Sequence, residues 1–170
     1  MKKGHIFLIG FMGAGKSTIS GVLHREYGLK QMEMDEEIER RQGRSISCIF
    51  AQDGEEYFRN LETQLLKSLD TEEKLVVSCG GGTAMRECNG REMKEQGTIV
   101  WLAVKPETIY NRVKNSHNRP LLEGNMNIEY IESLMNGRIP KYRAAADIVV
   151  DTDGRTAEDI CREIMSKAER

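Results

Sequence analysis

Residues 10–18 read Gly-Phe-Met-Gly-Ala-Gly-Lys-Ser-Thr, and they constrain the fold of this chain more than any other segment. They match the pattern G-x-x-x-x-G-K-[ST] of a phosphate-binding P-loop. The apolar run 5–9 before them predicts a buried parallel strand, and Ile19, Val22 and Leu23 after them follow helical spacing. A complete motif between a strand and a helix is more specific than a glycine-rich turn beside a surface lysine. We therefore interpret it as a phosphate-binding site.

The residue types in this loop suit a polyphosphate. Its glycines permit backbone angles that a side chain would forbid, so successive N–H groups can face a phosphate, and the next helix adds its positive N-terminal end. Lys16 offers a point charge for the outer phosphates, and the Ser17 hydroxyl is a candidate Mg²⁺ ligand. We expect nucleotide contacts from Gly13, Ala14, Gly15, Lys16, Ser17 and Thr18.

Length, charge and cysteine content exclude several classes of protein. The chain has 170 residues, enough for one domain with a substantial core, and its net charge of -2 argues against a general binder of nucleic acid or anionic membranes. No apolar run reaches the length of a membrane span, and the run after Met1 ends in the P-loop, which argues against a signal peptide. The four cysteines form no C-x-x-C pair, so we expect free thiols in a cytoplasmic protein without a membrane or nucleic-acid partner.

Strand and helix patterns alternate along the chain. Strands are expected at 5–9, 29–34, 74–79, 98–104 and 147–151, and helices at 17–27, 36–42, 45–52, 55–69, 86–95, 107–114, 128–146 and 156–168. Asp35 is expected to cap one helix, Gly54 to separate two, and Pro140 to bend or interrupt a long one. Continuous apolar strands that alternate with helices predict an α/β fold with a parallel sheet covered on both faces. The P-loop, Asp35 and Gly80–Gly82 follow strand ends and should converge on one cleft.

The other strand ends indicate what accepts the phosphate. Asp35 can orient a hydroxyl or take its proton, although it can equally be a helix cap alone. Gly80-Gly81-Gly82 offers a bare backbone wall to a polar ligand, or forms a tight turn. Arg59 can hold an anion, or pair with Glu62 three residues on. Phe50 and Phe58 can cover a ring, or pack in the core. Together the arginine, the carboxylate and the glycine wall suggest a small substrate with an anionic end and hydroxyl groups.

Five motifs then occur in the order that one family shows. They are the P-loop, the Asp35 helix start, the run 45–62 (Ser-Ile to Phe-Ala-x-Asp-Gly-Glu-x-x-Phe-Arg-x-x-Glu), the glycines 80–82, and Arg-Pro-Leu-Leu at 119–122. Over nearly its whole length the chain closely resembles shikimate kinase. The resemblance implies ATP-dependent phosphorylation of the shikimate 3-hydroxyl, with Mg²⁺, and small molecules as the partners of a monomer.

The resemblance also implies an architecture. It is a three-layer α/β/α domain of the P-loop kinase type, like that of nucleoside-monophosphate kinases, with a central five-stranded parallel sheet. A single domain would span 1–170. Its core would comprise 1–34, 70–112 and 128–170, with a helical substrate-binding region at about 35–62 and a mobile lid at about 113–126.

By the same likeness each site residue has an expected role. Catalysis would depend on Lys16, Asp35 and Arg119, the last reaching the transferring phosphoryl group from the lid. The nucleotide would also contact Arg112 and Arg155 near the adenine. Shikimate would contact Met12, Asp35, Phe50, Phe58, Arg59, Gly80, Gly81, Gly82 and Arg138, with the two arginines clamping its carboxylate.

One position departs from the family pattern. The second strand usually ends in Asp-x-Asp, whereas this chain has Glu33-Met34-Asp35. Glu33 keeps the charge but adds a methylene, so two expectations stay open: it helps Ser17 to hold Mg²⁺ through water, or it faces solvent. Two other functions also remain as alternatives, a related kinase acting on gluconate or a nucleoside monophosphate, and a catalytically silent ATP-binding regulator.

Overall fold

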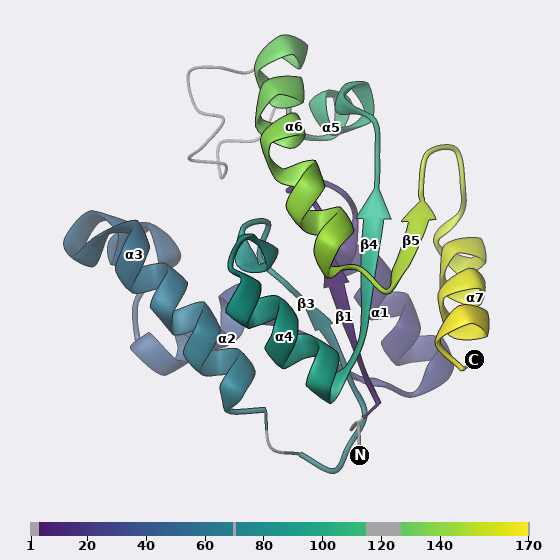
Figure 1. Ribbon diagram of the computed structural model, residues 1–170, viewed down its shortest axis with the longest axis horizontal. Coiled ribbons are helices and arrows are strands. Elements are labelled where there is room, and N and C mark those ends of the chain that lie inside the picture. Colours follow the sequence, from purple (N-terminus) through teal and green to yellow (C-terminus); the bar gives the residue numbers. More distant parts are fainter. Residues whose placement is uncertain (1–3, 70, 115–126, 170) are drawn as a thin grey trace.

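The computed structural model describes residues 4–69, 71–114 and 127–169, and its centre is a parallel five-stranded sheet (Figure 1). The strands are β1 (His5–Ile9), β2 (Lys30–Glu33), β3 (Leu75–Ser78), β4 (Gly97–Ala103) and β5 (Ile148–Asp151). Their order is β2-β3-β1-β4-β5, and each neighbouring pair is parallel. The predicted α/β fold with a five-stranded parallel sheet is confirmed. The order places β1, which leads into the P-loop, in the middle of the sheet.

Helices cover both faces of this sheet (Figure 1). They are α1 (Lys16–Tyr27), α2 (Met34–Gln42), α3 (Ile46–Lys67), α4 (Glu87–Gln96), α5 (Pro106–Val113), α6 (Ile128–Ala145) and α7 (Ala157–Ala168), with a short 3-10 turn, η1 (Thr83–Met85). One core lies between the sheet and α1, α5 and α7, and the other lies between the sheet and α2, α3 and α4. Helix α6 contributes to both cores, with Ile131 and Met135 in the first and Tyr142 and Ala145 in the second.

The central strand shows why the apolar runs are continuous. Ile6 and Leu8 pack into the core on the α1 side, and Phe7 and Ile9 pack into the core on the α4 side. All four are at most 3% exposed, because successive side chains of a strand point to opposite faces and both faces are covered.

The start of α2 differs from the sequence prediction. Asp35 is the second residue of α2 and not its cap, since Glu33 occupies the N-cap position and makes no side-chain capping bond. Strand β2 ends at Glu33 and α2 begins at Met34, so the last residue of the strand takes the N-cap position. Gly54 separates two helical stretches of α3 with φ 88°, as expected. The predicted interruption at Pro140 is wrong, because α6 continues through that residue.

Most of the expected lid lies outside the described residues. Within the segment 113–126 the structure describes only residues 113 and 114, so Arg119 and the lid remain predictions. No helix in the described ranges combines the length and apolarity that crossing a membrane requires.

Candidate active site

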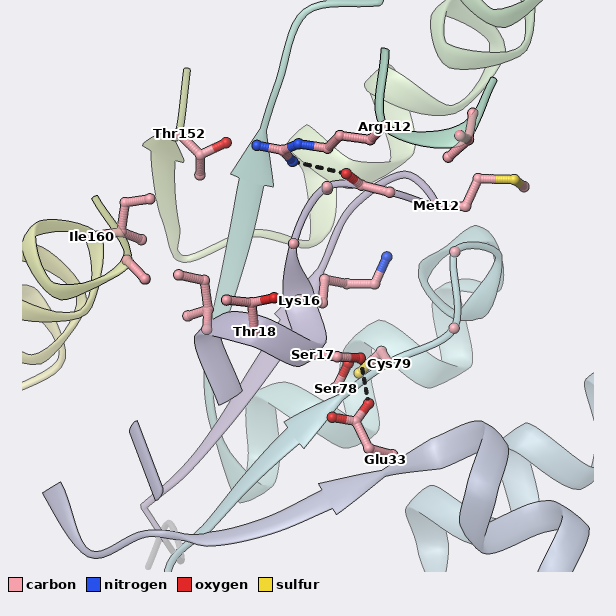
Figure 2. Close-up of a pocket in the computed structure, with 18 of the residues that line it drawn as sticks. Met12, Lys16, Ser17, Thr18, Glu33, Ser78, Cys79, Arg112, Thr152 and Ile160 are labelled. Carbon is pink, nitrogen blue, oxygen red and sulfur yellow. Dashed lines mark hydrogen bonds between the residues drawn. The ribbon is translucent and has the colours of Figure 1, made fainter. Parts of the chain in front are cut away.

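A cavity of about 560 Å³ opens where β1, β2 and β3 end (Figure 2). It brings the three predicted strand-end segments together. Among its lining residues are Met12, Gly13, Ala14, Gly15, Lys16, Ser17, Thr18, Glu33, Asp35, Gly80, Gly81, Arg112 and Arg155. The convergence follows from topology, because the carboxyl ends of parallel strands meet at one edge of the sheet.

The P-loop forms the nucleotide side of this cavity. Gly13 and Gly15 have φ of 81° and 96°, in the left-handed region that a side chain disfavours, and α1 begins immediately afterwards at Lys16. The Lys16 ammonium donates to the carbonyl oxygens of Gly10 at 2.6 Å and Phe11 at 3.0 Å. Figure 2 shows this amino group directed into the cavity. The loop therefore presents a fixed cation and the start of a helix to one small volume.

Glu33 faces the P-loop rather than bulk solvent. The Ser17 hydroxyl donates to its Oε2 atom at 2.9 Å, a contact drawn in Figure 2. The expectation that Glu33 merely faces solvent is therefore wrong. A hydroxyl beside a carboxylate at the mouth of a phosphate loop is a donor set that suits Mg²⁺. Within the described residues no group of three or more His, Cys, Asp or Glu side chains is placed to hold a metal ion, so phosphate oxygens and water would have to complete the coordination.

Asp35 lines the cavity at the start of α2. Solvent in the cavity reaches its carboxylate, but protein on the other sides partly removes it from water, and this desolvation raises its pKa above the ordinary value. The positive charges of Lys16 and Arg59 oppose that rise. The result is a carboxylate with raised proton affinity close to two cations, which suits a group that accepts a hydrogen bond or a proton from a hydroxyl.

The three glycines after β3 make room for charged side chains. A Cβ at Gly80 would lie 2.7 Å from Oε2 of Glu62 and 3.4 Å from Oδ1 of Asp35. At Gly81 it would lie 3.0 Å from Nη1 of Arg138, and at Gly82 only 2.6 Å from Nη1 of Arg59. Gly82 has φ -102°, which any residue can adopt, so the turn itself does not require glycine there. The bare backbone lets an acid and two guanidinium groups approach one wall.

Arg59 takes part in the ion pair that the sequence offered as its alternative role. Its Nη1 donates to Oε1 of Glu62 at 2.8 Å, and its Nη2 donates to Glu55 at 3.2 Å. Glu62 is fully buried and also accepts from the Thr83 hydroxyl. Burial raises the pKa of Glu62, and Arg59 opposes that shift. The pairing fixes the guanidinium and uses two of its five N–H donors, so it is compatible with anion binding.

Arg138 has a donor without a partner. Its Nη1 atom is buried, and none of the described residues accepts a hydrogen bond from it. Its guanidinium carbon lies 5.6 Å from the centre of the Phe11 ring, and Tyr142, one turn further along α6, donates to the Gly81 carbonyl at 2.5 Å. Since buried N–H groups in proteins nearly always have an acceptor, this donor is available to an anionic ligand.

Some predicted substrate contacts do not line the cavity itself. Phe50 and Phe58 pack against each other with ring centres 5.0 Å apart, and Phe58 belongs to the core, as its alternative reading held. Gly82, Arg59 and Arg138 lie just behind the lining, where the two arginines reach the glycine wall.

On the nucleotide side, Arg112 donates to the Gly13 carbonyl at 2.8 Å, and Arg155 pairs with Glu163 at 2.6 Å. The sequence reading missed Thr152 and Ile160, which also line this side (Figure 2). No motif marked them, because their place depends on how β5 and α7 pack. The sequence offered Glu62 as an ion-pair partner of Arg59 and as the last residue of the Phe-Arg-x-x-Glu motif, but it gave Glu62 no role in the site.

Comparison with known proteins gives a consistent result. A family model described as shikimate kinase matches residues 12–169. A shikimate kinase of Dehalococcoides mccartyi is 41% identical over 162 residues, which are 95% of this chain and 92% of the relative. One of Persephonella marina is 40% identical over 96% of this chain and 98% of its own. The solved shikimate kinase of Acinetobacter baumannii, in complex with shikimate, aligns with a TM-score of 0.89 at 34% identity, covering 96% of this chain and 92% of that one.

Proposed function

The chain belongs to the shikimate kinase family, and from this we propose that the cavity at the carboxyl edge of its sheet is where ATP and shikimate meet. The protein is an ATP-dependent kinase that transfers the γ-phosphate to the 3-hydroxyl of shikimate, giving shikimate 3-phosphate and ADP. The single observation that carries the site assignment is the glycine wall. It brings the guanidinium groups of Arg59 and Arg138 to one surface, close to Asp35 and to the start of the P-loop.

On the nucleotide side, we assign the phosphates to the backbone of residues 13–18 and to Lys16. The left-handed glycines and the start of α1 support this, since both aim N–H groups at one volume. Arg112 and Arg155 border the cavity where the adenine is proposed to bind. Arg119, outside the described residues, is proposed from the family pattern to reach the transferring phosphoryl group.

We assign Mg²⁺ to the Ser17 hydroxyl and the Glu33 carboxylate, whose oxygen atoms lie 2.9 Å apart. When bound there with the phosphates, the ion would neutralise charge that develops during transfer. These two residues supply oxygen ligands alone, which agrees with the preference of Mg²⁺.

On the acceptor side, Arg59 and Arg138 are proposed to bind the carboxylate of shikimate. The unpartnered Nη1 of Arg138 supports this, because a carboxylate would satisfy it. Asp35 would then accept a hydrogen bond from the 3-hydroxyl. In the transfer, the oxygen of that hydroxyl bonds to the γ-phosphorus, the bond from this phosphorus to the β–γ bridging oxygen breaks, and the proton passes to Asp35. Alignment and electrostatic stabilisation supply most of the rate.

The experiment is an acceptor panel with purified protein, ATP and Mg²⁺. We expect ADP to form with shikimate, together with shikimate 3-phosphate identified by mass spectrometry, and not with gluconate or nucleoside monophosphates. ATP binding without turnover on any acceptor would support a silent regulator instead. Light scattering of the same sample should give the mass of a monomer, the oligomeric state that we propose.

A further inference from the structure

The carboxylate of Glu33 is held from two sides by residues that the proposed mechanism does not use. The Ser20 hydroxyl lies 2.9 Å from its Oε1 atom, and the Gln31 amide nitrogen lies 3.1 Å from the same atom. Gln31 also donates to the Ser20 hydroxyl at 2.8 Å. Oε1 is therefore occupied by these two partners, which leaves Oε2 to accept from Ser17 at 2.9 Å. The network fixes which oxygen atom faces the P-loop.

The two supporting residues come from different elements. Ser20 lies on α1 three residues after Ser17 and is fully buried, while Gln31 lies on β2 two residues before Glu33. The Ser20 oxygen is also 3.2 Å from the Ser17 carbonyl. The single proton of Ser20 therefore has two acceptors within reach, and the shorter contact, to the charged carboxylate of Glu33, is the stronger one. The network connects the helix that carries Ser17 to the strand that carries Glu33.

Glutamate needs such support more than aspartate does at this place. It has one more rotatable bond, so a flexible Glu33 would lose more side-chain entropy on adopting a single rotamer. Two hydrogen bonds to Oε1 select that rotamer before any ligand binds. Residues that orient a metal-binding carboxylate in this way typically change metal affinity by about 10- to 100-fold when they are removed.

We propose that Ser20 and Gln31 are positioning residues that hold Glu33 against Ser17, so that the longer acid serves the Mg²⁺–phosphate end of the cavity. The inference rests on the proposed Mg²⁺ site. In this account Ser20 and Gln31 hold the longer side chain of Glu33 so that its carboxylate can take the place of the aspartate that the family usually has. Neither residue touches substrate in this account, since both act through Glu33.

The test measures binding of Mn²⁺, used as a probe for Mg²⁺, to the protein–ADP complex by electron paramagnetic resonance of the free ion. Ser20→Ala and Gln31→Met should each weaken Mn²⁺ binding about three- to tenfold, which is below the usual range because each change removes only one of two supports. The Mg²⁺ concentration for half-maximal activity should rise by the same factor, and the KM for shikimate should stay unchanged. Gln64→Met, a matched change at an exposed position on α3, should alter neither quantity.

A second background separates positioning from a general structural role. In Glu33→Asp the shorter side chain draws the carboxylate away from Ser20 and Gln31, so Ser20→Ala should then have no further effect on Mn²⁺ affinity. If Ser20→Ala lowered Mn²⁺ affinity equally in the wild type and in Glu33→Asp, the inference would be overturned. Unchanged Mn²⁺ affinity in Gln31→Met would overturn it as well, because position 31 is exposed and the variant should fold. If Glu33→Gln weakens Mn²⁺ binding but the supporting variants do not, the inference fails alone. If Glu33→Gln leaves Mn²⁺ binding unchanged, the proposed metal site fails with it.

Discussion

Replacing Gly82 by alanine tests the glycine wall directly. The new methyl group would lie 2.6 Å from Nη1 of Arg59 and 2.7 Å from its Cζ and Nη2 atoms. Gly82 has φ -102° and ψ 0°, so alanine causes no backbone strain there, and the three atoms nearest to the new methyl group all belong to Arg59. The variant therefore moves a proposed substrate-binding group without removing it.

The size of the effect follows from these distances. To restore an ordinary contact of 3.4 Å or more, the guanidinium must retreat by roughly 0.8 Å. A shift of that size displaces Arg59 from the carboxylate that it is proposed to bind, and misplacement by about 1 Å can cost a factor near 10². We therefore expect the KM for shikimate to rise about 10- to 100-fold, which corresponds to roughly 1.4–2.7 kcal/mol. The KM for ATP should change less than twofold, because the P-loop is untouched.

The assay is steady-state kinetics with each substrate varied in turn, accompanied by a thermal unfolding curve. Some loss of stability is expected, because moving Arg59 weakens a charge-assisted hydrogen bond of 2.8 Å to Glu62, which is fully buried. Gly137→Ala is the matched control. It lies on α6 next to Arg138, and a Cβ there would meet nothing within 4 Å. This control should keep wild-type kinetics.

Two results would refute the reasoning. An unchanged KM for shikimate in a folded Gly82→Ala variant would mean that Arg59 does not bind the acceptor. An equal rise in the KM values of ATP and shikimate would mean that the wall contributes to general stability of the site and not to acceptor binding.

The remaining predictions concern the acid, the second arginine and the thiols. Asp35→Asn should lower kcat about 10²- to 10⁴-fold in single-turnover assays, with near-normal shikimate binding by calorimetry. Desolvation raises the pKa of Asp35 in the folded protein, so the wild type loses stability as the pH rises through this raised pKa. Asp35→Asn should therefore unfold at a higher temperature than the wild type at pH 7. The difference between the two unfolding temperatures should shrink as the pH is lowered toward 3.8, the ordinary pKa of the group. Arg138→Ala should raise the KM for shikimate, and Arg138→Lys should not restore it, because the side chain reaches the wall with a planar guanidinium. Iodoacetamide with peptide mapping should label exposed Cys48 and spare Cys79, whose burial raises its thiol pKa.

Local patterns of residues determined the fold class and the two halves of the site. The P-loop could be read from residues 10–18 because each residue type there answers a local requirement, such as a left-handed φ at Gly13 and Gly15. The continuous apolar runs indicated strands that are buried on both faces, and strands of this kind predict a parallel sheet. The rule for strand ends predicted that Asp35 and the glycines after β3 would meet the loop, and Asp35, Gly80 and Gly81 line one cavity with it.

The partners of each polar group were decided by tertiary structure. No spacing in the chain shows that Gly82 leaves space for Arg59, because 23 positions separate them and only the packing of α3 against η1 brings them together. Likewise the sequence left the surroundings of Glu33 open, and its contacts with Ser17 and Ser20 depend on the packing of α1 beside β2. Periodicity and motifs report burial and local backbone geometry, whereas a hydrogen bond depends on where two separate elements place their atoms to within about 0.5 Å. That precision exists only in the folded chain.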